Sequence, residues 1–527
     1  MKELVFEELT LEQKLGLVLI GGGSWPLQRD PEEMAFQLDL IRKRALGAIW
    51  ISPNDSDPLW QDTIRLIRET ADYPILIFTD AGSGFGQPKI GDQISLGYAD
   101  DEDLAYTFGK VTAVKAHNAG YNVVCNPLLD RVDHNVPCGG TVRTLSPDKE
   151  KSARLAAAMA RGMHDGGILT VGKHYPSVAD DIDSHMAESC AMEDKETLLK
   201  DNLYAYQYLD KRGLLDGVMT SHTLLPKIDD KYPATLSKKV MDVFRETGFD
   251  GLMLTDAMSM MGVVAKFGAG HSKAQALAGG NDFILVFSSM IKAYEAMKEG
   301  YADGTITEER LNEAVKRVLK AQHKAMQAPK YTELTEEDEK KFNRINEKSV
   351  ATIVDPGLTA SIDPNGHYLF MLLTDQKVDL EAPRVNEDTL TFRWYDPFRI
   401  AQEIKKRFPN SDTATLAEYP VNWDIAAACE KELAYDDVVF ITFCNYYPYA
   451  GKEQFTSRIV SVFEAWQVTH RICALLHFGN PFVMEDLPHV PRILNGCRSA
   501  GCVITALDIL AGTREAEGKI PYKIKLK

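Results

Sequence analysis

The sequence has little that would mark a membrane, secreted or redox protein. It contains no uninterrupted apolar run that approaches the roughly 20 residues of a membrane-spanning helix. Residues 1–4 include an acid and are not followed by the basic and apolar segments of a secretory signal. The eight cysteines form no Cys-x-x-Cys pair, which argues against a zinc or redox motif. We therefore expect a cytoplasmic protein.

Positive charge is also scarce. The 527 residues include 59 lysines and arginines against 76 aspartates and glutamates, which gives a net charge of −17. Such a surface repels phosphate backbones and anionic lipids, so we expect neither nucleic acid nor membrane as a partner. No Gly-x-Gly-x-x-Gly opens a helix after a predicted strand, and we predict no cofactor and no metal. A neutral small molecule suits this composition, and no feature specifies the oligomeric state.

The first part of the chain contains a regular series of short apolar runs. They occupy residues 15–20, 48–52, 75–79, 121–125, 168–172, 217–221, 251–255 and 283–287. Continuously apolar runs are typical of strands buried on both faces of a parallel sheet. Helix-length amphipathic segments, such as residues 147–163, lie between them. Eight such units predict a (β/α)8 barrel; a doubly wound sheet is the alternative, but the even spacing favours closure.

A change of pattern predicts two domains. A helix over residues 307–327, with Thr307 as its N-cap, ends the first pattern. We assign residues 1–328 to the barrel and residues 329–350, which are strongly charged, to a linker that contains some helix. Residues 351–527 again alternate apolar runs, at 368–373, 437–443 and 472–477, with helical segments. They predict an open α/β sandwich.

In a barrel of this kind, catalytic groups collect where the strands end at the C-terminal face. The polar residues that follow predicted strands are Asp80, Asp130, Lys173, His174, His222 and Asp256. Simpler roles stay open for three of them: Asp80 could start a turn, Asp130 could form a surface ion pair, and His222 could be a core histidine. Asp256 directly follows an apolar strand, where a carboxylate is costly to bury without a partner or a function.

The segment of residues 172–190 is the richest in reactive side chains. Asp183 and His185 are two residues apart, so in extended backbone they project to the same side. A carboxylate in that position can accept the imidazole N–H and fix the tautomer. The pair is therefore a candidate general acid near neutral pH. The simpler interpretation is an acidic, solvated loop with an incidental histidine.

Two longer patterns carry a family resemblance. Residues 173–176 read Lys-His-Tyr-Pro and are followed by Asp183-Ser184-His185, while residues 255–260 read Thr-Asp-Ala-Met-Ser-Met. These patterns resemble glycoside hydrolase family 3, in particular its β-N-acetylhexosaminidase branch. Residues 10–14, 126–143, 278–286, 478–481 and 511–524 are also similar to the family, so that the resemblance covers nearly the whole chain.

The resemblance implies retaining hydrolysis of a small carbohydrate through a covalent glycosyl-enzyme intermediate. Asp256 would be the nucleophile, and Asp183 and His185 a dyad in which His185 is acid and then base. The residues expected to hold sugar hydroxyls or to line the pocket are Asp80, Asp130, Arg143, Lys173, His174, His222 and Met260, with Asp130 supporting Arg143. The chain departs from the family at Ser177-Val178-Ala179, where the family has Gly-His-Gly in a slightly longer loop.

Three other functions stay open at this point. A family member of this kind can transfer the glycosyl unit to phosphate instead of water. A metal-dependent barrel hydrolase could use His174, His185 and His222 with an aspartate. A sugar-binding protein that has lost catalysis would be consistent with the shortened loop before Asp183.

Overall fold

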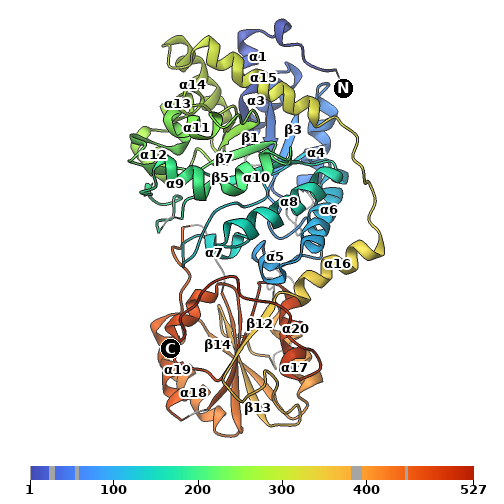
Figure 1. Ribbon diagram of the computed structural model, residues 1–527, viewed down its shortest axis with the longest axis vertical. Helices are drawn as coiled ribbons and strands as arrows, with labels where there is room; N and C mark the ends of the chain where they lie inside the picture. Colours follow the sequence, from blue (N-terminus) through green and yellow to red (C-terminus); the bar gives the residue numbers. More distant parts are fainter. Residues whose placement is uncertain are drawn as a thin grey trace. The chain divides into compact units, whose positions relative to one another are not determined.

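The computed structural model describes residues 2–22, 30–53, 59–179, 181–380, 395–444, 449–469 and 471–527. The chain forms two compact units, which are described separately below (Figure 1). The first comprises Met1–Gln87, Ala105–Val132 and Asp148–Glu339. The second comprises Pro88–Leu104, Asp133–Pro147 and Lys340–Lys527.

This division differs from the predicted one in two short segments. Pro88–Leu104 and Asp133–Pro147 belong to the second unit, although they lie within the predicted barrel domain. The physical reason is that Ile94, Tyr98 and Val142 are part of a hydrophobic cluster of the second unit. The change of unit after Glu339 falls inside the predicted linker, and α16 (Glu336–Glu347) supplies its helix. The exact limits at 328 and 351 stay a prediction.

The first unit is a nearly closed parallel barrel, as the sequence predicts. In sheet order its strands are β10 (Leu252–Thr255), β7 (Gly217–Thr220), β5 (Leu169–Tyr175), β4 (Val123–Val124), β3 (Leu76–Thr79), β2 (Ala48–Trp50), β1 (Leu19–Gly22) and β11 (Ile284–Leu285). A parallel bridge between Leu254 and Phe283 joins the two ends of this sheet. Both residues are fully buried in the cluster that fills the barrel.

Helices surround the barrel (Figure 1). They are α1 (Leu11–Leu17), α3 (Pro31–Arg42), α4 (Leu59–Thr70), α6 (Glu102–Asn118), α8 (Lys149–Asp165), α9 (Lys195–Thr197), α10 (Tyr204–Asp210), α11 (Lys238–Arg245), α12 (Met261–Phe267), α13 (His271–Ala278), α14 (Met290–Ala302) and α15 (Glu308–Lys324). The Thr307 side chain caps α15 by accepting from the Arg310 N–H, which confirms the predicted N-cap. A small sheet of β6 (Ser189–Cys190), β8 (Thr223–Leu225) and β9 (Asp229–Pro233) was not predicted.

The first strand lies later in the chain than predicted. Residues 15–17 belong to helix α1, and β1 begins only at Leu19. The cause is a capping box, in which the Thr10 hydroxyl accepts from the Gln13 N–H and the Gln13 side chain accepts from the Thr10 N–H. This local signal starts a helix that continues through the first half of the apolar run.

The second unit is an α/β sandwich around one sheet. Its strands in order are β12 (Val350–Val354), β17 (Arg492–Gly496), β16 (Ile472–Phe478), β15 (Asp437–Phe443), β13 (Tyr368–Thr374) and β14 (Asp412–Ala417), and β12 pairs antiparallel with β17. The helices are α5 (Ile94–Ala99), α7 (Gly140–Arg143), α16, α17 (Pro397–Arg407), α18 (Asn422–Glu432), α19 (Ser457–Val468) and α20 (Ala500–Leu510). Successive residues of β13 point to opposite faces of the sheet. Phe370 and Met371, for example, belong to two different hydrophobic clusters, so both faces of the sheet are covered.

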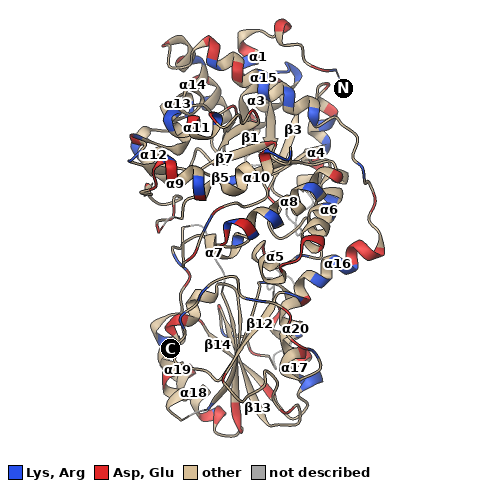
Figure 2. Ribbon diagram, in the orientation of Figure 1, with Lys and Arg blue, Asp and Glu red and all other residues tan. Residues whose placement is uncertain are grey.

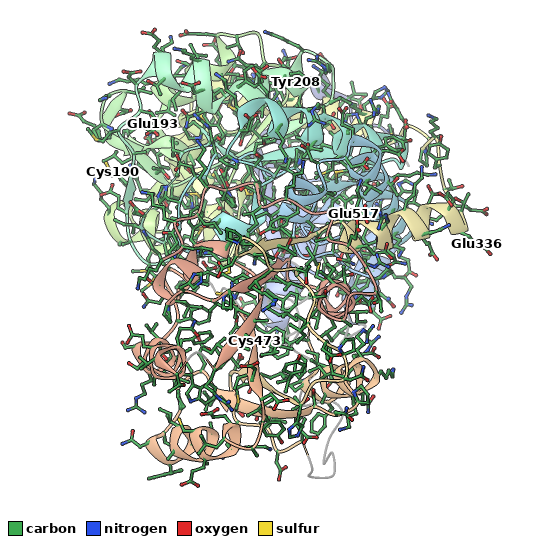
Figure 3. The ribbon with its side chains drawn as sticks, turned by 60° about the horizontal axis from the view of Figure 1, so that its bottom comes forward. Cys190, Glu193, Tyr208, Glu336, Cys473 and Glu517 are labelled. Atoms are coloured by element: carbon green, nitrogen blue, oxygen red, sulfur yellow. The ribbon has the colours of Figure 1, made fainter. Side chains whose placement is uncertain are left out.

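Charged residues are frequent on the helices, and the cysteines lie both in the interior and at the surface. Lys, Arg, Asp and Glu colour the helices, whereas β13 and β14 are almost wholly uncharged (Figure 2). All eight cysteines lie in the described part of the chain, and none of them forms a disulfide bond. Cys125 is buried in the barrel core. Cys473 packs against a hydrophobic cluster of the second unit, and Cys190 is exposed (Figure 3).

None of the helices in the described part of the chain combines the length and the apolar composition of a membrane span.

Candidate active site

Polar side chains from several barrel strands contact one another beyond the carboxyl ends of the strands. Lys173, near the end of β5, is buried and its ammonium group forms an ion pair with Asp80, which follows β3. The next residue, His174, contacts Asp130, which follows β4. These contacts bring together residues that are 93 and 44 positions apart in the chain.

Asp130 fixes the orientation of the His174 ring. One carboxylate oxygen, Oδ1, accepts from the main-chain N–H of His174 at 2.8 Å. The other, Oδ2, is 2.7 Å from the ring nitrogen Nδ1. Because a carboxylate accepts, Nδ1 carries the hydrogen and Nε2 points to the other side of the ring. Nε2 lies 3.7 Å from Oδ2 of Asp256.

Lys173 and His174 both reach these acids although they are neighbours on one strand. Successive side chains of a regular strand point to opposite faces. The pairing of β5 with β7 is irregular between Lys173 and Tyr175. Such an irregularity re-aims a side chain. The strand continues to Tyr175, the residue before Pro176, so Lys173 and His174 lie within it, and not after it as the run at 168–172 had indicated.

Asp256 is a half-buried carboxylate that lies close to His174. Burial by itself raises the pKa of Asp256, but the nearby His174 and Lys173 outweigh burial and hold the pKa below its usual value. The main-chain N–H of Ala257 donates to Oδ1 at 2.7 Å. Asp256 is therefore ionised at neutral pH and keeps one oxygen, Oδ2, on the side of His174.

Asp183 and His185 make the contact that their spacing predicts. Oδ1 of Asp183 accepts from Nδ1 of His185 at 2.7 Å and from its main-chain N–H at 3.0 Å. The Asp183 side chain is only 3% exposed, whereas the His185 ring is 27% exposed. The carboxylate thus fixes the tautomer, and a proton exchanged with a substrate would be carried on Nε2.

His222 and Met260 are buried, at 1% and 3% exposure. Nε2 of His222 lies 3.1 Å from the carbonyl oxygen of Ala257, and Nδ1 lies 2.9 Å from the hydroxyl of Thr235. Burial lowers the pKa of His222, and a carbonyl oxygen only accepts, so Nε2 carries the hydrogen. The ring therefore bonds to the residue after Asp256, a contact that the sequence did not indicate.

Thr235 and Asn281 support this arrangement and were missed by the sequence interpretation. The Asn281 amide donates to the carbonyl oxygen of Thr235, and its oxygen accepts from the Thr220 hydroxyl. Nothing in the local pattern around Thr235 distinguishes it from an ordinary loop threonine. Asn281 lies in the segment 278–286 that carried the resemblance, which was the one signal available.

Arg143 is the last residue of α7 and belongs to the second unit. Both carboxylate oxygens of Asp130, its predicted supporter, are bonded to His174. Contact of Arg143 with a sugar stays a prediction.

Comparison with known proteins identifies the family. The model of the glycosyl hydrolase family 3 N terminal domain matches residues 27–321. The chain belongs to glycosyl hydrolase family 3. The match spans the strands that carry Asp80, His174 and Asp256, and it confirms the resemblance that the two sequence patterns indicate.

Two similar curated proteins are named beta-hexosaminidase. A beta-hexosaminidase of Pseudomonas aeruginosa (strain LESB58) is 32% identical over 199 residues, which are 37% of this chain and 59% of that protein. A beta-hexosaminidase of Idiomarina loihiensis is 29% identical over 49% of this chain and 80% of its own length. The aligned part is therefore less than two thirds of the Pseudomonas protein.

Solved structures show the same fold over almost the whole chain. A family 3 beta-N-acetylglucosaminidase from Paenibacillus sp. str. FPU-7 has a TM-score of 0.82 at 23% identity, and the alignment covers 98% of this chain and all of that one. A beta-glucoside phosphorylase has a TM-score of 0.81 at 19% identity, covering 98% and 94%. These similarities confirm the barrel followed by the α/β sandwich.

Proposed function

We propose that this protein is a retaining exo-glycosidase that removes a terminal β-linked N-acetylglucosamine or a closely related sugar. The observation that carries the proposal is the Asp183–His185 pair, with its 2.7 Å contact, in a family 3 barrel whose ionised Asp256 ends a strand. The relatives from Pseudomonas and Idiomarina are named beta-hexosaminidases, which supports an N-acetylhexosamine as the sugar that is removed.

The reaction proceeds in two displacements. Asp256 attacks the anomeric carbon, while Nε2 of His185 gives a proton to the departing glycosidic oxygen. His185 then takes a proton from water, and this water displaces Asp256 from the anomeric carbon. Two inversions restore the starting configuration. Asp183 stabilises the imidazolium whenever His185 holds both protons.

The remaining polar groups bind the sugar. The Asp80 carboxylate is half-exposed while its partner Lys173 is buried, so Asp80 can accept from hydroxyls as Lys173 holds it in place. His174 presents Nε2 beside Asp256. These groups would orient the ring so that the anomeric carbon meets the carboxylate. The cytoplasmic location also stays a proposal.

A direct test is an assay with 4-nitrophenyl β-N-acetylglucosaminide against the corresponding glucoside. We expect turnover of the first and a first-formed β-anomer in proton NMR. An initial α-anomer would mean inversion and would contradict Asp256 as nucleophile. No turnover of either substrate would favour the sugar-binding alternative. A rate that rises with phosphate, with release of a sugar phosphate, would identify transfer to phosphate.

The metal-dependent alternative does not fit the donor set. It requires His174, His185 and His222 to present lone pairs to one ion. Nε2 of His222 instead donates to the carbonyl oxygen of Ala257, so this nitrogen has no lone pair to offer to an ion. Activity that is unchanged by a chelator would agree with this assignment.

A further inference from the structure

The loop that carries the dyad is hydrogen-bonded to the first turn of α12. The carbonyl oxygen of His185 accepts from the main-chain N–H of Met261 at 3.2 Å. The carbonyl oxygen of Ser184 accepts from the N–H of Gly262 at 3.0 Å. The first N–H groups of a helix have no partner within the helix, so they are available for such contacts.

The same turn follows the proposed nucleophile directly. Asp256 leads through residues 257–260 into α12, and this short segment is anchored near Asp256 on both sides. His222 donates to the carbonyl oxygen of Ala257 at 3.1 Å, and the N–H of Met258 donates to the carbonyl oxygen of Leu285 at 3.1 Å. A rigid connection therefore links the carboxylate of Asp256 to the backbone of His185.

Gly262 fits this contact because it has no side chain. A Cβ at this position would lie 2.7 Å from the carbonyl oxygen of Ser184 and 2.9 Å from that of Ala187. Both distances are shorter than a carbon–oxygen contact allows, and both involve backbone, which cannot rotate away. The backbone of Gly262 is outside the left-handed region, so an alanine is excluded by space and not by conformation.

We propose that the first turn of α12 is a latch that sets the position of His185 relative to Asp256, with the Met261 N–H and Gly262 as its positioning residues. The proposal rests on the proposed function, in which Asp256 is nucleophile and His185 is acid. The latch acts only on the placement of the acid. Its loss should therefore affect substrates that need a proton on the leaving group and spare those that do not.

Met261→Pro removes the N–H with little other change. Met261 is the first residue of α12, where proline is tolerated, and Met260 has φ −68° and ψ 140°, which suits a residue before proline. Met261→Ala is the matched control, because it loses the same side chain and keeps the N–H. Relative to this control, we expect kcat/KM for chitobiose to fall roughly tenfold, the worth of one backbone hydrogen bond. The value for 4-nitrophenyl β-N-acetylglucosaminide should change by less than about twofold, since its leaving group needs no acid.

Gly262→Ala tests the close approach independently, and it serves if the proline variant does not fold. The added Cβ would displace the carbonyl groups of Ser184 and Ala187, and alanine favours a helix more than glycine, so we expect the dyad loop to shift while α12 persists. Gly270→Ala is the control, because its Cβ would meet only the Ala296 methyl group at 3.9 Å. We expect the same selective loss on chitobiose in Gly262→Ala and none in Gly270→Ala.

Combination with His185→Ala separates the two proposals. If the latch acts through the imidazole, Met261→Pro adds nothing further in the His185→Ala background. Additive losses, or equal losses on both substrates, would overturn the latch. If His185→Ala itself shows no preference between the leaving groups, the assignment of the acid fails instead.

Discussion

Asp256 is the residue on which the chemistry of the site depends most directly. Asp256→Asn keeps the size of the side chain but removes the charge, so we expect the fold to persist and turnover to fall by several orders of magnitude. The measurement is kcat on an aryl substrate, with Asp230→Asn, an exposed position, as control. A 2-fluoro sugar should label Asp256 in the unmodified protein. A label on Asp183 would contradict the assignment.

His185 allows a second prediction at this scale. Proton transfer by a positioned acid contributes about 10²–10⁴-fold, and a nitrophenolate leaves without it. His185→Ala should lose most of that factor in kcat/KM on chitobiose and far less on 4-nitrophenyl β-N-acetylglucosaminide. Asp183→Ala should act in the same direction but less, because the imidazole survives in a looser orientation. An equal loss on both substrates would make His185 a binding residue.

Among single residues, the local contact was predictable and the distant ones were not. The Asp183–His185 contact was predicted from the two-residue spacing in extended backbone, but the structure makes it in a turn, in which the N–H groups of Met186 and Ala187 donate to the carbonyl oxygen of Asp183. Both oxygens of Asp130 bond to His174, a contact that the sequence analysis did not indicate. That pairing depends on β4 and β5 lying side by side, which no local pattern specifies.

At the scale of elements, the packing of α6 on α8 depends on two glycines. An added Cβ at Gly109 would lie 2.0 Å from the carbonyl oxygen of Met159, and one at Gly162 would lie 2.1 Å from that of Tyr106. Gly109→Ala must therefore separate the helices, and we expect it to lower the free energy of unfolding by about 1–3 kcal/mol. Urea denaturation measures this, with Gly270→Ala as control. An unchanged value would show that the two helices can move apart at no cost.

The elements themselves were largely predictable where their period is regular. The runs at 437–443 and 472–477 coincide with β15 and β16 almost to the residue. The first predicted strand was wrong over residues 15–17, because the Thr10–Gln13 capping box extends α1 into the apolar run. The edge strands β12 and β14 were missed: β14 lacks a continuous apolar run, and β12 begins at the last residue that was assigned to the linker.

For the molecule as a whole, a buried acid links stability to pH. Asp216 precedes β7 and accepts from His164 at 2.7 Å and from the Thr170 N–H at 2.8 Å, and it pairs with Lys324. Burial by itself raises the pKa of Asp216, but His164 and Lys324 outweigh burial and lower this pKa to about 2. The difference from the usual 3.8 corresponds to about 2 kcal/mol of the free energy of unfolding.

This contribution is present above pH 3.8 and is lost as the pH falls through about 2, because protonation then removes the carboxylate from the folded protein. We expect the free energy of unfolding of the unmodified protein to fall over this range. In Asp216→Asn this part of the dependence should be missing, whereas Asp230→Asn should retain it. Denaturant titrations at a series of pH values provide the measurement. An identical pH profile in Asp216→Asn would contradict the prediction.

The sequence by itself determined the fold class, the family and the strand ends near which the polar residues lie, because each of these follows from hydrophobic periodicity or from motifs of a few residues. Only the tertiary structure decided which of those residues touch. The pairing of Lys173 with Asp80, the two bonds from His174 to Asp130 and the contact of His185 with Met261 all join distant parts of the chain. Such contacts are set by strand order and close packing around the barrel, and a linear pattern does not specify these.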